Sequence, residues 1–296
     1  MSNRSNIQSY GVQIFRRLRR KFVYDLILRS YGKKRLRLLS MQNAKDENHS
    51  YTKFFRSPLQ MEVLLDQIAH LVDAHQYEKL TIYVFAASNG SEVYTLAAEL
   101  LTSLPALEFE ILGSDHQQSL IDKAACGIYS FDEIYSHNFD SRRCEGLFIK
   151  KDDGYHVRPE IKGRCIFRKI DILSDDLSKS LSKADVIFAQ NVFCHMDAHD
   201  VRRAFANIMH CLKSNGIMAI CGMGLDLRVE LTKKYGLDPV RTKVRAIHQE
   251  ARQHIPEKWW RYYWGIEPYR IFCTDKMRRY STIFVDQPFH GEVRAQ

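Results

Sequence analysis

Five residues that could contact a ligand each follow a segment with the composition of a buried strand. They are Asp115, Asp171, Ile172, Gln190 and Asn191. Ligands of open parallel sheets bind at the carboxyl ends of the strands, so these positions favour ligand contact. The carboxylate of Asp115 could hold both hydroxyls of a ribose, or it could help to cap a helix that starts near residue 119. Gln190 and Asn191 have no such structural alternative, which makes them the better candidates.

Small residues fill the segment 86–92, which has the sequence AASNGSE. They would let a ligand approach the backbone, and the N-terminus of the helix that follows favours anionic groups. Ala87 and Glu92 are the candidate contacts in this segment. The segment lacks the GxGxxG fingerprint, so a tight turn between a strand and a helix explains its composition equally well.

Two histidines, His195 and His199, are four residues apart, as metal ligands on a helix can be. Asp197 lies between them and is a typical N-cap residue, so a helix is expected to begin between the two imidazoles. This arrangement places them on different elements, and we expect no metal site. His195 is a candidate for contact with the substrate or for taking a proton; an ordinary surface position is the alternative.

The spacing of apolar residues predicts strands that alternate with helices, as in a parallel sheet covered on both faces. The expected strands are 80–87, 109–113, 165–168, 185–189 and 217–221. The expected helices are 58–77, 92–104, 119–126 and 198–212. Near the end of the chain, we expect an antiparallel hairpin from 269–274 and 280–285.

An additional segment, 226–268, separates the fifth strand from the hairpin and is expected to be helical. All three tryptophans lie in its aromatic cluster, residues 259–264. This cluster could be a helix packed on the sheet, a lid or acceptor pocket, or, least favoured, a surface that stacks nucleic-acid bases.

The net charge of +9 comes from one N-terminal segment, because residues 16–37 contain ten basic residues and one acid. The remaining chain is neutral. Apolar residues recur on one face of a helix over 12–29, opposite the arginines. We therefore predict a basic amphipathic arm and linker over 1–45 and a second domain over 46–296.

The basic part of this arm, residues 14–37, allows three interpretations. It could pack on the main domain through its apolar stripe, or it could dock an acidic protein or an anionic membrane surface. Nucleic acid is the least favoured partner, because the charge is confined to one short segment.

The composition excludes a mainly disordered or fibrous protein, since 45% of the 296 residues are hydrophobic and 27% are charged. The longest apolar stretch, 80–87, is far shorter than the ~18–20 residues of a membrane-spanning helix. No secretory signal is expected at the N-terminus. Seven cysteines without a CxxC pair favour a reducing compartment. We expect a cytoplasmic protein, one that could bind at the periphery of a membrane.

A set of motifs, in the same order along residues 51–225, resembles those of the CheR-type methyltransferases, which methylate chemoreceptor glutamates. The family segments are TxFFR, TGEEPYS, ASD with AxxGxY, a segment before the third strand, IxFCRNV and LKPxG. Their counterparts here are TKFFR at 52–56, NGSEVYT at 89–95, GSD at 113–115 with AACGIY at 124–129, VRPEI at 157–161, VIFAQNV at 186–192 and LKSNG at 212–216.

This resemblance implies a Rossmann-like α/β methyltransferase fold that binds S-adenosylmethionine. The fold has a mostly parallel seven-stranded sheet with helices on both faces. The candidate cofactor contacts are then Ser50, Thr52, Arg56, Ala87, Glu92, Asp115, Asp171, Ile172, Gln190 and Asn191. By resemblance, Glu92 would accept from the methionine ammonium and Asp115 would hold the ribose. Asp171 and Ile172 would flank the adenine.

The chain departs from the family beside the transferred methyl group, which Gln190 and Asn191 would border. The family has Arg where this chain has Gln190, and Tyr where it has His195. Losing a cation weakens the case for a carboxylate acceptor, because Arg binds carboxylates bidentately. We predict catalytic roles for Gln190, His195 and Arg56.

The predicted function is methyl transfer from S-adenosylmethionine to a protein carboxylate or to a small molecule. Transfer from a sulfonium is a single displacement, so the enzyme mainly aligns the reactants and excludes water. The alternative is a module that keeps the cofactor fold without catalysis and serves in regulation or in docking to a membrane or partner.

Overall fold

The computed structural model describes residues 52–75, 77–135, 140–253 and 265–286. All of them belong to one unit, residues 50–296. The predicted basic arm and its boundary, together with Ser50 and the tryptophan cluster 259–264, lie outside the described residues.

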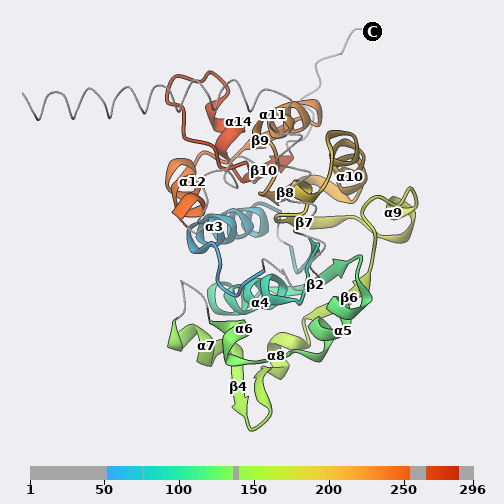
Figure 1. The fold of residues 1–296 in the computed structure, drawn as a ribbon, viewed down its shortest axis with the longest axis vertical. Helices are drawn as coiled ribbons and strands as arrows, with labels where there is room; N and C mark the ends of the chain where they lie inside the picture. Colours follow the sequence, from blue (N-terminus) through green and yellow to red (C-terminus); the bar gives the residue numbers. More distant parts are fainter. Residues whose placement is uncertain (1–51, 76, 136–139, 254–264, 287–296) are drawn as a thin grey trace, which may run out of the picture. The chain divides into compact units, whose positions relative to one another are not determined.

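A seven-stranded sheet forms the centre of the described unit, in the order β6-β2-β1-β7-β8-β10-β9 (Figure 1). The strands are β1 (Lys79–Phe85), β2 (Glu108–Asp115), β6 (Cys165–Lys169), β7 (Ala184–Ala189), β8 (Leu212–Ile220), β9 (Leu237–Pro239) and β10 (Ile283–Asp286). The first five run parallel to one another, and β10 runs antiparallel to its neighbours β8 and β9. The five predicted parallel strands and the predicted fold class are confirmed.

Helices cover both faces of this sheet, because successive side chains of a buried strand point to opposite faces. On β1, Ile82 and Val84 pack in one apolar cluster with helices α3, α4 and α12. Tyr83 and Phe85 belong to a second cluster with α9, α10 and α11. The helices are α3 (Pro58–His75), α4 (Ser91–Ser103), α5 (Gln118–Cys126), α9 (Leu177–Ser180), α10 (Ala198–His210), α11 (Leu225–Lys234), α12 (Val244–Gln253) and α14 (Lys276–Tyr280).

The antiparallel C-terminal strand is confirmed, but its predicted hairpin partner is wrong. Residues 269–274 form no strand, and β10 pairs instead with β8 and β9. Phe272 is fully exposed, so the apolar composition of this segment does not reflect burial. The residues that follow form helix α14, where Arg279 Nη2 bonds to Asp275 Oδ2 at 2.9 Å across one helical turn.

A small antiparallel sheet, which the sequence analysis did not predict, lies at the end of the unit away from α11 and α14 (Figure 1). Its strands, in the order β3-β5-β4, are β3 (Ile128–Tyr129), β5 (Gly154–Val157) and β4 (Phe148–Lys151). Short helices α6 (Phe131–Ile134), α7 (Ser141–Leu147) and α8 (Pro159–Lys162) flank it. The rings of Tyr129 and Phe148 pack against Phe54, and this contact joins the small sheet to the segment before α3.

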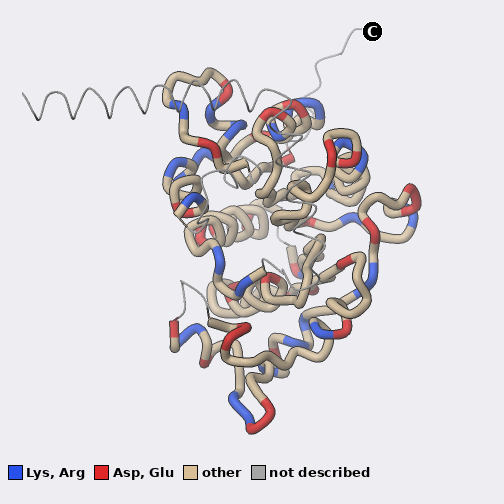
Figure 2. The backbone as a smooth tube through the Cα atoms, in the orientation of Figure 1, with Lys and Arg blue, Asp and Glu red and all other residues tan. Residues whose placement is uncertain are grey.

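Acidic and basic residues are interspersed along the described part of the chain (Figure 2). Among the described residues, none of the helices has both the length and the apolar character that a membrane span requires.

Candidate cofactor and acceptor site

The segment 52–56 reaches the sheet through its two phenylalanines. Phe54 is completely buried, with its ring centroid 4.9 Å from that of Tyr129 and 5.0 Å from that of Phe148, both nearly perpendicular. The backbone N–H of Phe55 donates to Thr95 Oγ1 at 3.3 Å. These contacts fix the segment on helix α4 and place the next residue, Arg56, beside the start of that helix.

Arg56 links two of the predicted site residues. Its guanidinium forms an ion pair with the carboxylate of Glu92 in the first turn of α4. The side-chain amide of Asn191 also faces Arg56. With its oxygen turned toward the guanidinium, this amide accepts hydrogen bonds of 2.5 and 2.8 Å. The structure therefore brings together Glu92, which follows β1, Asn191, which follows β7, and Arg56 from the segment before α3.

The carboxyl group of Glu92 lies in a buried environment. Burial raises its pKa, and the positive charge of Arg56 opposes this effect. The net shift is upward, so the ionised form of Glu92 is less stable in the folded protein than in water. A second cation, such as an ammonium group, would be attracted to this carboxylate.

Asp115 ends β2, and its buried carboxylate is held by backbone donors. Oδ2 accepts from the N–H of Ser88 at 3.0 Å, and Oδ1 accepts from the N–H of Gln117 at 3.1 Å. Ser88 lies in the loop after β1 and has a positive φ of 51°. Asp115 therefore orders this loop and the residue before α5, and its role toward a ribose stays a prediction.

The loop after β1 packs closely against its neighbours, as in the tight turn between a strand and a helix that the sequence allowed; the approach of a ligand to its backbone stays a prediction. Ala87 is buried, and its N–H donates to the carbonyl of Ser114 at 2.8 Å. Gly90 has φ +87°, and a Cβ there would lie 2.9 Å from the Cβ of Ala124. Both the left-handed backbone and the lack of space require glycine at this position.

Asp171 and Ile172 follow β6, next to Asp115, whose carbonyl accepts from the N–H of Ile170 at 2.9 Å. Asp171 is exposed, and its Oδ1 accepts from the N–H of Leu173 at 2.9 Å. The side chain of Ile172 is buried in the apolar cluster below α10. Both residues thus lie at the predicted edge of the sheet. Their roles toward adenine stay predictions.

Two buried polar atoms of the predicted site have no hydrogen-bond partner among the described residues. They are Nε2 of Gln190 and Oγ1 of Thr52. An unpaired buried polar group costs about 1–3 kcal/mol, so such atoms are rare in native proteins. A ligand that supplies partners at this edge of the sheet would remove the cost. The residues therefore fit S-adenosylmethionine, whose amino-acid and ribose groups carry both donors and acceptors.

His195 lies in a short 3-10 helix (η1, Phe193–His195) that follows β7. The side chain of His195 is exposed at the surface, but the surrounding protein still desolvates the imidazole. This desolvation, together with the nearby imidazole of His116, lowers the pKa of His195. A neutral imidazole is able to accept a proton, so His195 is suited to general-base chemistry at neutral pH.

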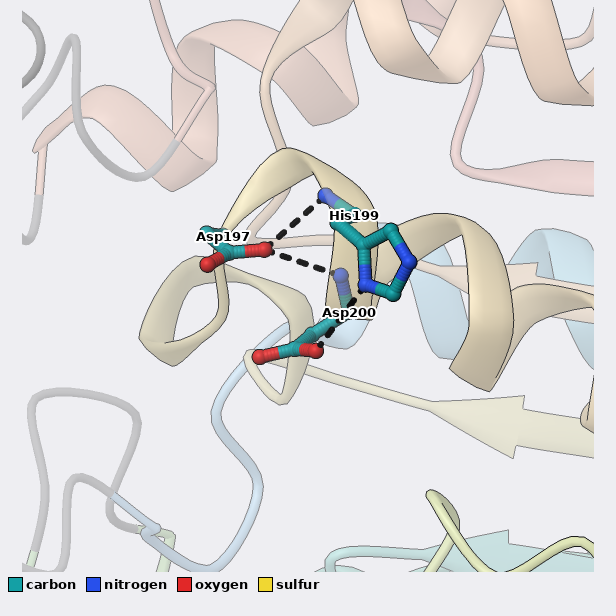
Figure 3. Close-up of side chains that lie close together, drawn as sticks. All are labelled: Asp197, His199 and Asp200. Atoms are coloured by element: carbon teal, nitrogen blue, oxygen red, sulfur yellow. Dashed lines mark hydrogen bonds and ion pairs between the residues drawn. The ribbon is translucent and has the colours of Figure 1, made fainter.

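The predicted N-cap of α10 is confirmed. Figure 3 shows Asp197, His199 and Asp200 at the start of this helix, with Asp197 Oδ1 accepting from the N–H groups of His199 and Asp200, both at 2.9 Å. His199 Nδ1 lies 3.5 Å from Asp200 Oδ1. Capping of the helix thus accounts for this cluster, and His195 and His199 lie on different elements as expected.

Three residues that were not among the predicted site residues also shape the site. Ser88 supplies an N–H to Asp115, Gly222 makes room for Asn191, and Gln60 of α3 lies beside the Arg56–Glu92 pair. Ser88 and Gly222 each follow a strand, so their positions in the sequence could have indicated a place at this edge of the sheet. Gln60 lies inside a helix, and nothing in its local sequence sets it apart.

Comparison with known proteins identifies the family. The model of the CheR methyltransferase SAM-binding domain matches residues 50–234, well over half of the chain. The chain belongs to this family. The match includes all eleven predicted site residues, from Ser50 to His195, so the SAM-binding domain is the part of the family that this chain shares.

The relatives include chemotaxis protein methyltransferases of several bacteria. The protein of Listeria innocua is 28% identical over 169 residues, which cover 57% of this chain and 63% of that protein. Chemotaxis protein methyltransferase 2 of Vibrio cholerae is 27% identical over 186 residues, 61% of this chain and 63% of that protein. The chain thus matches somewhat less than two thirds of the length of these relatives.

Proposed function

We propose that this protein is an S-adenosylmethionine-dependent methyltransferase. The observation that carries the proposal is the cluster Arg56–Glu92–Asn191 at the carboxyl ends of β1 and β7, with Asp115 on the neighbouring strand β2. Glu92 would hold the methionine ammonium and Asp115 the ribose. The cofactor supplies an electrophilic methyl group when bound, and the protein orients the acceptor and excludes water.

The acceptor that we favour is an amine or hydroxyl group, with a carboxylate as the competing possibility. Gln190 can donate hydrogen bonds but cannot offset a negative charge. Arg56 already forms an ion pair with Glu92. Desolvation lowers the pKa of His195 and favours its neutral form, which would take the proton that such a nucleophile must lose. These residues suit an uncharged nucleophile better than a carboxylate, which needs a cation and no base.

The test is to incubate the protein with methyl-labelled S-adenosylmethionine and a lysate of the source cells, and then to identify the labelled species. Label that survives mild alkali supports an amine or hydroxyl acceptor. Label that is released as methanol from glutamate or aspartate returns the protein to carboxyl methylation. Cofactor binding without any transfer would favour the non-catalytic module instead.

We also propose a cytoplasmic location, because the odd number of cysteines and the lack of a CxxC pair are typical of reducing compartments. The basic segment 14–37 would dock an acidic protein or an anionic membrane surface. Deleting residues 1–40 should then leave cofactor affinity unchanged and abolish the salt-sensitive binding to anionic vesicles or acidic partners. Loss of the cofactor site in the truncated protein would show that the arm supports the core.

A further inference from the structure

Residues 268–274 expose two neighbouring apolar side chains at the surface of the unit, just before helix α14 (Figure 1). Phe272 is 100% exposed and Ile271 is 57% exposed. Within the part of the chain that the structure describes, no other large apolar side chain is as exposed as Phe272. A single apolar side chain at a surface is ordinary, but two adjacent ones that the fold leaves in water favour contact with another surface. We call this segment the apolar tip.

The apolar tip is held in place by the buried side chain of Tyr280. The Tyr280 hydroxyl accepts from the N–H of Arg270 at 2.9 Å and donates to the carbonyl of Pro268 at 3.0 Å. The ring of Tyr269 lies on that of Tyr280, with the centroids 4.5 Å apart, and the ring of His248 of α12 lies 4.7 Å from it. Because these contacts order the backbone at the base of the tip, the exposure of its apolar side chains is part of the fold.

Positive charge predominates around the apolar tip. The described segments 240–253 and 265–280, which contain the tip and helices α12 and α14, carry eight lysines and arginines and three acidic residues. Arg245 of α12 is exposed and lies over an aromatic ring of the tip, with its Cζ 6.0 Å from the ring centroid. Two of the three acids are offset, because Asp275 forms an ion pair with an arginine of α14 and burial raises the pKa of Glu250. The tip therefore combines an exposed apolar pair with a charge that is complementary to an anionic surface.

We propose that the apolar tip inserts into the surface of an anionic lipid membrane, with Ile271 and Phe272 below the headgroups and Arg245 and Lys276 at the level of the lipid phosphates. Two apolar side chains are too few for the about 800 Å² that each partner buries in a stable protein–protein interface. A fluid lipid surface, in contrast, accepts a single protruding ring and binds the cations beside it. The tip alone would give only marginal binding, so it adds a second contact to the docking that we propose for the basic segment 14–37.

The test measures how the full chain partitions onto two kinds of vesicle: phosphatidylcholine alone, and phosphatidylcholine mixed with phosphatidylglycerol. The wild-type protein should bind the mixed vesicles more tightly. Phe272→Ser should lower its partition coefficient on them about tenfold, because a large apolar side chain no longer leaves water. Arg245→Gln should lower it about fivefold on the mixed vesicles, since one cation near the anionic surface is lost.

Phe131→Ser is the matched control, because Phe131 of α6 is also an exposed phenylalanine, at 49%, beside the small sheet at the other end of the unit. It should leave partitioning unchanged, and thermal unfolding shows whether each variant is folded. Equal binding of wild type and Phe272→Ser would overturn the inference, as would an equal loss in Phe131→Ser.

The lipid is tested separately from other occupants of the tip. Wild-type protein that binds neither kind of vesicle, or both equally, would overturn the inference, because the anionic surface would then have no role. Sedimentation without lipid tests for a second copy of the chain: a wild-type dimer that Phe272→Ser dissociates would assign the tip to that interface instead. None of these outcomes bears on methyl transfer, which is measured with labelled cofactor.

Discussion

Asn191 occupies the space that a side chain on Gly222 would need. A Cβ on Gly222 would lie 2.6 Å from Cα and 3.1 Å from the backbone nitrogen of Asn191. The two residues follow the neighbouring strands β7 and β8, and the N–H of Asn191 donates to the carbonyl of Cys221 at 3.2 Å. The position of Asn191 beside Arg56 therefore depends on a glycine thirty-one residues away in the sequence.

Gly222→Ala should destabilise the protein and displace Asn191. Gly222 has φ +64°, and alanine in this left-handed conformation costs about 1–2 kcal/mol before the clash is counted. Thermal unfolding measures the loss of stability, and calorimetry with S-adenosylmethionine measures the loss of affinity. Gly224→Ala is the control, since φ is −56° and a Cβ there meets nothing within 4 Å. Equal effects of the two substitutions would contradict the proposed contact.

Glu92→Gln should remove a dependence of stability on pH. Because burial raises the pKa of Glu92 above its ordinary 4.5, the folded state binds more protons than the unfolded state between the two values. The wild-type protein should therefore lose stability as the pH rises through this range, and the variant should not. Urea unfolding of both proteins from pH 4 to pH 8 tests the difference. Parallel curves would show that Glu92 titrates normally. The variant should also bind S-adenosylmethionine more weakly, because it lacks the charge that holds the ammonium.

Asp115→Ala should weaken binding of S-adenosylmethionine by roughly 1.5–3 kcal/mol, the scale of hydrogen bonds to a charged group. The substitution also removes the acceptor of the Ser88 N–H, so the variant must first be shown to fold. Asp122→Ala, on the exposed side of α5, is a suitable control. Calorimetry on the folded variants gives the affinities, and an unchanged value for Asp115→Ala would remove this residue from the ribose site.

His195→Ala should lower turnover much more than cofactor affinity if the imidazole takes the acceptor's proton. Turnover of the wild-type protein should rise with pH through the pKa of His195, which desolvation and His116 lower from its ordinary 6.5. The acid limb of kcat/KM, which reports the free protein, should therefore lie below pH 6.5. His116→Ala should shift this acid limb to higher pH, because the variant lacks one of the two causes that lower the pKa of His195. A limb that does not respond to either substitution would exclude His195 as the base.

Lys213→Met should destabilise the protein more than Asp185→Asn. The carboxylate of Asp185 is 1% exposed and pairs with Lys213 Nζ at 2.9 Å, whereas the lysine is 37% exposed. Removing the lysine leaves the buried charge of Asp185 unpaired, which lowers the free energy of unfolding by about 3–5 kcal/mol. Asp185→Asn keeps an acceptor for the N–H of Thr81 and leaves a lysine that water can solvate. Urea unfolding at neutral pH gives the free energies of unfolding of the two variants. A greater loss of stability in Asp185→Asn than in Lys213→Met would show that the pair is not effectively buried.

The parallel part of the fold followed from the sequence because β1, β2, β7 and β8 each contain a run of at least four buried residues, and their apolar composition reflects this burial directly. The edge strand β6 is partly exposed. The C-terminal part did not follow from the sequence, because β9 has only three residues and owes its place in the sheet to β10. Residues 269–274 have the aromatic and branched side chains of a strand, yet Ile271 and Phe272 are exposed. The neighbouring Asp275–Arg279 pair belongs to a helix. Local composition could not show that β9 is a strand and that residues 269–274 are not, because pairing with distant strands decides whether such short segments join a sheet.

For the site, the residue types that follow each strand and the family that they resemble could be predicted from the sequence. This was possible because strand ends and the short motifs around them are local features of the chain. The ion pair of Arg56 with Glu92, thirty-six positions later, and the contact of Arg56 with Asn191 became visible in the folded protein. Only the structure placed an unpaired buried amide, Gln60, beside them. Such contacts arise from the packing of α3 and α4 on the sheet, and the sequence of no single element contains them.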